Sequence, residues 1–391
     1  MEIHDLLRWM LEQGASDMHL KVGLPPSLRI SGRIARAPSE PITADDLWRW
    51  VQGLAAPEVV SRLRAEREAD FSYALLDDDG TPISRFRCNI FHQMGKPGAV
   101  LRVIPQHTPS LEALGMSSLV PLTEREYGIV LVTGPTGSGK STTLAALIDH
   151  INTTHDKHIL TVEDPVEFVH VDKRCIVNQR EVGTDTLSFG EALRRALRQD
   201  PDVILVGEMR DAETITIAMT AAETGHLVLS TLHTNDAKQT IDRVINAFPP
   251  DEQHQVRAKL AVTLTGVVSQ RLMRRKDGHG RVAVQEVMIS SPTIKKLIEE
   301  GKIGQMDKAI EDSGDFYGMR SMNQHLLHLW SEGRIEEDDA LAVSNNPGDL
   351  RLKMQTQRFS EQAAGERAEA AGASPPSEAP AAKRGLESRY G

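Results

Sequence analysis

The sequence predicts an α/β protein with a mostly parallel sheet, preceded by a smaller α+β domain. From about residue 125 onward, short aliphatic segments alternate with helical segments, as in sheets whose strands are covered by helices on both faces. These segments are 129–132, 159–162, 203–206 and 227–232. Before residue 104, short alternating segments with few helices are typical of a small α+β domain. The length of 391 residues agrees with two folded units plus appendages.

The smaller domain is expected over residues 1–104 and opens with a helix. Five apolar residues recur at the spacing of one helix face, and Gly14 then ends the pattern. They are Ile3, Leu6, Leu7, Met10 and Leu11. Strand-like segments follow, interrupted by a helical stretch near 43–67. Pro105 and Pro109 each favour extended backbone in the residue before them, so we expect a linker over residues 105–124.

The larger domain is expected over residues 125–355, with helices at 293–302 and 320–334 after the sheet. Residues 356–391 are rich in Ala, Glu, Pro, Gly and Ser and contain few apolar residues. Such a composition cannot offset the entropy lost on ordering, so we expect a disordered tail there.

Composition narrows the function classes. The formal net charge of −10 disfavours a protein that coats nucleic acid, because such affinity depends on Lys and Arg neutralising phosphates. No segment approaches the roughly 18 apolar residues of a membrane span, and the start of the chain lacks a secretory signal pattern. We therefore expect a cytoplasmic protein without direct membrane insertion. Cys88 and Cys175 stand far apart, which leaves neither a disulfide framework nor a multi-cysteine zinc site.

A phosphate-binding motif carries the strongest functional signal. Residues 134–141 match the pattern G-x-x-x-x-G-K-[ST] between a predicted strand and a predicted helix. In that context backbone N–H groups wrap a phosphate, and the helix N-terminus adds a favourable potential. We predict an ATP site in which Lys140 contacts the β- and γ-phosphates and the Ser141 hydroxyl binds Mg²⁺. The expected nucleotide-binding residues are Gly134, Pro135, Thr136, Gly137, Ser138, Gly139, Lys140, Ser141 and Thr142.

Two acidic residues follow predicted strands, at the edge where open α/β sheets bind ligands. Glu163 follows residues 159–162 and is the candidate general base, or water-orienting group, for attack on the γ-phosphate. The alternative is a solvated loop carboxylate. Glu208 follows residues 203–206, with Gly207 where a Walker B strand usually ends in Asp, and we assign Glu208 to Mg²⁺ through water. Alternatively Glu208 caps the next helix, although Asp211 suits that cap better.

Two histidines flank the predicted strand at 227–232. Six intervening residues place His226 and His233 too far apart for one metal site. Each is either a hydrogen-bonded structural histidine or, at the carboxyl end of a strand, a sensor of the γ-phosphate.

Four segments together resemble the Walker A, Asp box, Walker B and His box of secretion and pilus ATPases, and among these the PilT/PilU type of retraction ATPase. They are residues 134–141, 161–168, 197–211 and 224–235. The similarity covers about residues 1–355, and the segment that follows the first helix, Gly14-Ala-Ser-Asp-Met-His-Leu, also fits. It implies a PAS-like N-terminal domain, a RecA-like C-terminal domain, a homohexamer, and nucleotide held between the two domains.

The resemblance also implies that arginines of the N-terminal domain reach the phosphates. The matching residues are Arg85 and Arg87, which lie two apart on a predicted strand and so share a face, with Arg102 further on. The alternative is that they are ordinary exposed arginines of an amphipathic strand. Together with Glu163, Glu208, His226 and His233 they make up the expected catalytic set.

The function that the resemblance implies is ATP hydrolysis that rotates domains, turns an inner-membrane pilus platform protein and retracts type IV pili in twitching motility. The protein would be a cytoplasmic motor, peripheral at the inner-membrane base of the pilus. Residues 293–300, Thr-Ile-Lys-Lys-Leu-Ile-Glu-Glu, differ in charge from the Ala-Ile-Arg-Asn-Leu-Ile-Arg-Glu of PilT-type enzymes, and residues 340–353 resemble the extension of PilU-type paralogues. A PilU-like accessory ATPase that depends on a PilT hexamer therefore stays open.

Other classes fit the residues less well. A related secretion or pilus-assembly ATPase usually carries a longer N-terminal region and a tetracysteine zinc module, which two cysteines exclude. A module that holds ATP without hydrolysing it would not need both Glu163 and Glu208. A nucleic-acid motor would need basic loops and stacking aromatics, whereas aromatic residues make up only 4% of this negatively charged chain.

Overall fold

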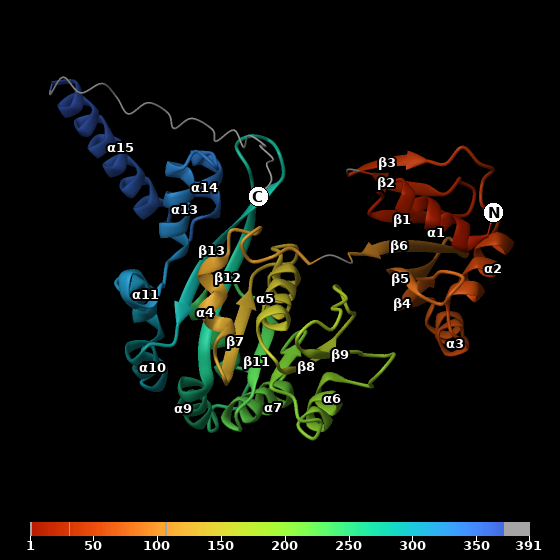
Figure 1. The fold of residues 1–391 in the computed structure, drawn as a ribbon, viewed down its shortest axis with the longest axis horizontal. Coiled ribbons are helices and arrows are strands. Elements are labelled where there is room, and N and C mark those ends of the chain that lie inside the picture. The colour runs from red at the N-terminus through yellow and green to blue at the C-terminus, as the bar shows by residue number, and fades with distance from the viewer. Residues whose placement is uncertain (1, 31, 106–107, 371–391) are drawn as a thin grey trace, which may run out of the picture. The chain divides into compact units, whose positions relative to one another are not determined.

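The computed structural model describes residues 2–30, 32–105 and 108–370. The chain forms two compact units: residues 1–273 with 281–321, and residues 274–280 with the chain from Met322 onward. The first unit holds two sheets, one in the N-terminal domain and one in the domain that follows it (Figure 1).

The N-terminal domain is a six-stranded antiparallel sheet with three helices, in the order β3-β2-β1-β6-β5-β4. Its elements are α1 (Ile3–Glu12), β1 (Asp17–Lys21), β2 (Ser27–Ile30), β3 (Arg33–Arg36), α2 (Ala44–Leu54), α3 (Pro57–Glu66), β4 (Glu68–Leu76), β5 (Pro82–Gln93) and β6 (Lys96–Ile104). Leu6 and Leu7 of α1 and Leu47 of α2 are fully buried in one core with Met18 and Phe86 of the sheet. The predicted α+β class of this domain is confirmed.

The helical stretch expected near 43–67 is two helices in the structure. The Thr43 hydroxyl caps α2 by accepting the N–H of Asp46 at 3.1 Å, and α2 ends at Leu54. Pro57 then begins α3, because proline lacks an N–H and disfavours helix in the residue before it.

The second sheet has seven strands in the order β13-β12-β7-β11-β10-β8-β9. They are β7 (Gly128–Thr133), β8 (His158–Glu163), β9 (Ile176–Glu181), β10 (Val203–Val206), β11 (Leu227–Leu232), β12 (Leu264–Arg274) and β13 (Arg281–Ile289). All neighbouring pairs from β12 to β9 are parallel, which confirms the predicted sheet. Ile129 and Leu131 of β7 enter one apolar cluster, whereas Val130 and Val132 enter another. The aliphatic segments are thus explained by burial on both faces.

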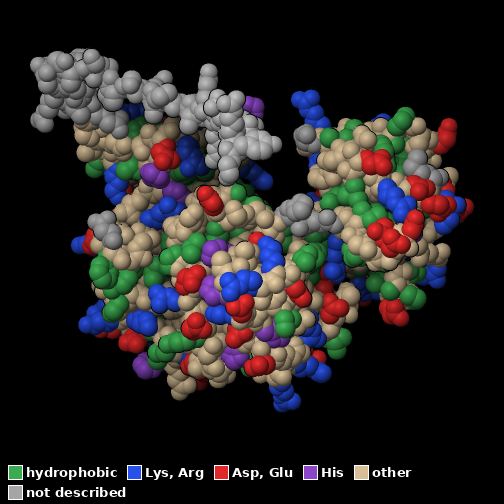
Figure 2. Space-filling view, viewed as in Figure 1, with side chains coloured by type: hydrophobic (Ala, Val, Ile, Leu, Met, Phe, Trp, Pro, Cys, Tyr) green, Lys and Arg blue, Asp and Glu red, His purple; other side chains and the backbone are tan. Residues whose placement is uncertain are grey.

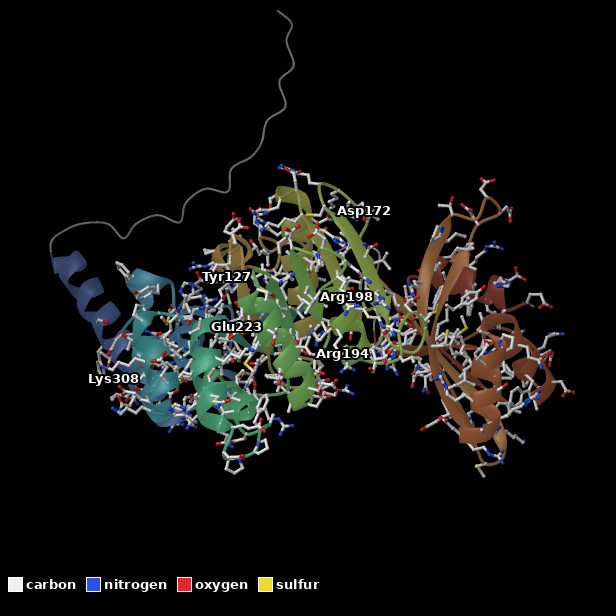
Figure 3. The ribbon with its side chains drawn as sticks, turned by 90° about the horizontal axis from the view of Figure 1, so that it is seen from below. Tyr127, Asp172, Arg194, Arg198, Glu223 and Lys308 are labelled. Atoms are coloured by element: carbon white, nitrogen blue, oxygen red, sulfur yellow. The ribbon has the colours of Figure 1, made fainter. Side chains whose placement is uncertain are left out.

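Helices cover both faces of this sheet (Figure 1). They are η1 (Ser117–Leu119), α4 (Val120–Thr123), α5 (Lys140–Thr154), α6 (Phe189–Ala196), α7 (Ala212–Glu223), α8 (Ala237–Ile245), α9 (Gln253–Thr263), α10 (Pro292–Glu299), η2 (Ile303–Gln305) and α11 (Met306–Glu311). The short helix α12 (Gly314–Tyr317) follows them, and none of its described residues is buried. Leu147 and Ile151 of α5 pack in the cluster that contains Val130, whereas α7, α8 and α9 pack in the cluster that contains Ile129. Figure 3 labels Tyr127, Arg198 and Glu223, which precede β7, β10 and β11 and so mark the amino ends of these strands.

The expected linker over residues 105–124 belongs partly to the second domain. Leu111, Met116 and Leu119 are buried in the same cluster as Val130 of β7. Within the predicted linker, the residues from Leu111 onward therefore pack against the second sheet, and residues 106–107 lie outside the described chain.

The second unit contains α13 (Met322–Ser331), α14 (Glu337–Val343) and α15 (Pro347–Ala370). Residues 356–370, which we expected to be disordered, are helical in α15. Leu350 and Met354, one turn apart, are fully buried and anchor this helix, and the Glu, Arg, Gln and Ala residues beyond them favour helix. Residues 371–391 of the expected tail lie outside the described residues.

Charged side chains of both signs are interspersed on the face in view (Figure 2). None of the helices in the described part of the chain combines the length and the apolar character that a membrane crossing requires.

Candidate active site

A cavity of about 520 Å³ lies at the carboxyl ends of β7, β8, β10 and β11. It brings together most of the residues that the sequence pointed to, including the motif of residues 134–141 and both acidic candidates. The predicted site residues that line it are Arg87, Arg102, Thr136, Gly137, Gly139, Lys140, Ser141, Thr142, Glu163, Glu208 and His233. Gly134, Pro135 and Ser138 complete the same loop, whereas Arg85 and His226 do not line the cavity.

The loop between β7 and α5 has the tight backbone that its glycines predict. Gly134 has a φ of 147°, and a Cβ at that position would lie 2.3 Å from the carbonyl oxygen of Gln270. Only glycine fits there. Lys140, the first residue of α5, donates from Nζ to the carbonyl oxygens of Gly134 at 2.9 Å and Pro135 at 3.2 Å. Burial lowers the pKa of Lys140, while Glu208 and Glu167 act to raise it.

Gln270 of β12 supports this loop, and sequence reasoning missed it. Its side chain is buried, its Nε2 donates to the Ser138 carbonyl at 2.7 Å, and its Oε1 accepts from the Thr143 hydroxyl at 2.8 Å. The available signal was a glutamine that follows the apolar pair Val267-Val268 within a strand-like segment, because an amide buried there must find partners.

Glu163 ends β8 and faces the cavity. Its Oε1 accepts hydrogen bonds from the Thr161 hydroxyl at 2.7 Å and from Gln179 Nε2 at 3.2 Å. Burial raises the pKa of the Glu163 carboxyl, while the bonds from Thr161 and Gln179 act to lower it. Glu163 is therefore a desolvated strand-end carboxylate rather than a solvated loop group, and its environment suits proton transfer.

Glu208 follows β10 after Gly207, where there is little room for a side chain. A Cβ on Gly207 would lie 3.3 Å from the Val162 carbonyl oxygen and 3.4 Å from the Glu163 Cα. The carboxylate thus comes from the next residue, and Arg210 Nε donates to Glu208 Oε2 at 2.8 Å. Asp211 accepts the N–H of Thr214 and caps α7, so the capping alternative for Glu208 is wrong.

The two histidines lie at opposite ends of β11. His233 follows the strand, with Nδ1 3.4 Å from Lys140 Nζ and Nε2 3.5 Å from Glu208 Oε1. His226 precedes the strand, and its Nδ1 lies 2.9 Å from the carbonyl oxygen of Ala221. The catalytic expectation for His226 is therefore not supported within this chain, because strand direction carries it to the edge away from the cavity.

The arginines of the N-terminal domain divide between two environments. Arg87 and Arg102 pair across β5 and β6 and line the cavity, with Arg102 Nε 2.7 Å from Asp17 Oδ1. Arg85 instead lies 3.7 Å from Glu181, a buried carboxylate at the end of β9. Two of the three predicted arginines thus reach the cavity.

The residues present fit a magnesium ion bound together with nucleotide. Among the described residues there is no group of three or more His, Cys, Asp or Glu side chains that could hold a metal. Ser141 at the start of α5 and Glu208 both line the cavity, and Mg²⁺ commonly takes one or two protein ligands, several waters and phosphate oxygens.

Comparisons with known proteins agree with this architecture. The family described as Type II/IV secretion system protein matches residues 3–322. The Type IV pilus retractation ATPase PilT of Pseudomonas aeruginosa is 48% identical over 348 residues, which cover 89% of this chain and 99% of that protein. The Type IV pilus ATPase PilU of the same organism is 39% identical over 355 residues, which cover 90% of this chain and 91% of that protein. A crystal structure of the pilus retraction motor PilT with bound ADP matches with a TM-score of 0.83 at 43% identity, over 90% of this chain and 99% of that one.

Proposed function

Because this chain belongs to the Type II/IV secretion system protein family, we propose that it is an ATP-hydrolysing motor that retracts type IV pili. The observation that carries the proposal is the convergence of Lys140, Glu163 and Glu208 on one cavity at the carboxyl ends of parallel strands. Two relatives over nearly the whole chain bear the names of type IV pilus ATPases, which supports the same conclusion.

Each residue has a role in the proposed hydrolysis. Lys140 and the backbone N–H groups of residues 134–141 bind the phosphates of ATP, and Ser141 with Glu208 holds Mg²⁺. When bound, Mg²⁺ neutralises charge on the phosphate oxygens. Glu163 orients the attacking water and accepts its proton, and His233, between Lys140 and Glu208, senses the γ-phosphate. Arg87 and Arg102 stabilise charge on the transferring phosphoryl group.

The proposed assembly is a homohexamer that acts on an inner-membrane platform protein at the base of the pilus. Within it, nucleotide state would change the position of the N-terminal domain, since Arg87 and Arg102 belong to that domain and the phosphate-binding loop does not. Phosphate charge would then couple hydrolysis to movement.

A second candidate is an accessory ATPase that depends on a PilT-like partner. It is favoured by residues 340–353, which resemble the extension of PilU-type paralogues and end within the first turns of the helix α15. Gel filtration combined with an ATPase assay, alone and with a PilT hexamer, separates the two. We expect a hexamer that hydrolyses ATP alone. Activity only with the partner would establish the accessory role, and no activity in either case would contradict the motor.

Arg87 provides a test of the coupling. We expect Arg87→Ala to leave the hexamer and most ATP affinity intact but to lower turnover by roughly 10²–10³, as the loss of one transition-state donor does elsewhere. Distance measurements between labels in the two domains, with a non-hydrolysable ATP analogue and with ADP, should show a smaller change in the variant. Arg36→Ala on the exposed strand β3 serves as the matched control. Equal distances in both nucleotide states of the parent protein would exclude this coupling.

A further inference from the structure

Two side chains on neighbouring strands converge on Glu163. Thr161 and Glu163 lie two apart on β8 and so share one face of the sheet. In the parallel pairing of β8 with β9, Thr161 is opposite Gln179, which places the glutamine on that same face. Both residues donate to a single oxygen, Glu163 Oε1, at 2.7 Å from Thr161 and 3.2 Å from Gln179.

From this geometry we infer that Thr161 and Gln179 are positioning residues that orient the Glu163 carboxylate toward the attacking water. The inference rests on the proposed function, in which Glu163 orients water and accepts its proton. The backbone N–H of Glu167 is a third donor to the same carboxylate. A hydrogen bond donated to a carboxylate favours its charged form, so the bonds from Thr161 and Gln179 oppose the effect of burial on the Glu163 pKa.

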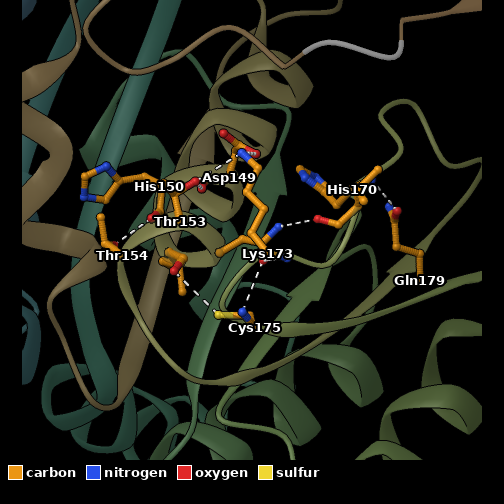
Figure 4. Close-up of polar contacts among 11 residues, drawn as sticks. Asp149, His150, Thr153, Thr154, His170, Lys173, Cys175 and Gln179 are labelled. Carbon is orange, nitrogen blue, oxygen red and sulfur yellow. Dashed lines mark hydrogen bonds and ion pairs between the residues drawn. The ribbon is translucent and has the colours of Figure 1, made fainter.

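Gln179 is itself held on both sides of its amide. Its Nε2 also donates to the Phe168 carbonyl at 2.9 Å. Its Oε1 accepts the N–H of His170 at 2.8 Å, as Figure 4 shows. These contacts determine which end of the Gln179 amide faces Glu163, because Gln179 Oε1 already accepts the N–H of His170. The nitrogen therefore points its N–H groups toward the carboxylate and the carbonyl.

The loop that Gln179 binds is also tied to α5. Asn152, fully buried on that helix, donates to the Val171 carbonyl at 2.8 Å and accepts the N–H of Lys173 at 3.1 Å. Lys173 adds a bond from Nζ to Asp149 at 2.7 Å (Figure 4). The loop that holds the Gln179 amide is therefore itself anchored to α5, as a positioning role for Gln179 requires.

Other charged groups also face Glu163, and their charges contribute to the pKa of its carboxyl group. α6 packs against Leu160 and Val162, on the face of β8 opposite to Glu163. The charged side chains of α6 therefore do not face the Glu163 carboxylate. The groups on the Glu163 side are Glu181 on β9, Asp164, Glu167 and His170 in the following loop, Glu208 and Arg210 after β10, and Lys140, His233, Arg87, Arg102 and Arg281 around the cavity. The variants below leave all of them in place.

The test compares the pH dependence of ATP turnover in the parent, Thr161→Val, Thr161→Ser and Gln179→Glu. Valine removes the hydroxyl at nearly constant volume, and serine restores it. Glutamate at position 179 keeps an acceptor for the His170 N–H but loses the donor to Glu163 and adds a like charge. Thr263→Val, at a buried threonine of α9 outside the cavity, is the control for the loss of a buried hydroxyl.

We expect Thr161→Val and Gln179→Glu to lower kcat at neutral pH by about 10–10², the scale of losing one hydrogen bond to a charged group, with KM for ATP unchanged. Glu163 acts as a base in its ionised form. Loss of a donor raises its pKa, so the acid limb of the profile moves to higher pH and activity recovers in alkaline solution. Thr161→Ser and Thr263→Val should have the same kcat and the same pH profile as the parent protein. ADP affinity, unchanged in each variant, verifies folding.

Three outcomes would overturn the inference. A parental profile in both Thr161→Val and Gln179→Glu, while Glu163→Gln loses turnover, would leave the role of Glu163 intact and remove the positioning role. An equal loss at every pH, with no movement of the acid limb, would reduce both residues to structural supports. A Glu163→Gln variant that turns over at the parental rate would instead contradict the proposed function, on which the inference rests.

Discussion

The Lys140→Ala variant is expected to lose nucleotide affinity and turnover together, each by about 10²–10³. The Lys140 ammonium reaches back to the loop before α5, and in the proposed site it would contact the phosphates in both the ground state and the transition state, so its removal should weaken the binding of both. Calorimetric titration with ATP and a steady-state ATPase assay measure the two losses separately.

Lys238→Ala is the matched control for this variant, because Lys238 forms an exposed ion pair with Asp307 at 3.1 Å and does not line the cavity. It should bind and hydrolyse ATP as the parent does. Unchanged ATP affinity in Lys140→Ala would contradict the assignment of residues 134–141 to phosphate binding.

The Glu163→Gln variant should separate binding from chemistry. The amide keeps the shape of the side chain but cannot accept a proton, so ATP stays bound while kcat falls by about 10²–10⁴, the contribution expected of a general base. Single-turnover measurements on preformed enzyme–ATP complex isolate this step from product release. Glu252→Gln, an exposed carboxylate before α9, should have no effect. Hydrolysis at the parental rate in Glu163→Gln would make Glu163 a structural residue.

The sequence predicted those features that depend on neighbours along the chain. The strands β7, β8, β10 and β11 are buried on both faces and therefore appear as short aliphatic segments. Three other strands of this sheet, β9, β12 and β13, were not identified. β9 is an edge strand of mixed polarity that ends in Asn178-Gln-Arg-Glu, and β12 contains the buried Gln270.

The environment of the candidate site depended on pairing that the sequence does not show. Gln179 meets Glu163 only because β9 pairs with β8 in one register, and the contact joins residues sixteen apart in the chain. The direction of the strand could have been used to tell which of the two histidines lies near the site, but our interpretation did not use it. In a parallel sheet a residue before the strand lies at the amino edge, which separates His226 from His233.

Gly207 limits how this site can change over evolutionary time. A Cβ at this position would lie 3.3 Å from the Val162 carbonyl oxygen, so introducing the common Walker B aspartate there would require a small shift of the backbone of β8 just before Glu163. The proposed metal residue, Glu208, and the proposed water-orienting residue, Glu163, thus lie on neighbouring strand ends that pack against each other at Gly207. A lineage that exchanged one Walker B form for the other would therefore have to accommodate this contact, and a substitution that lets β8 shift would make the exchange easier.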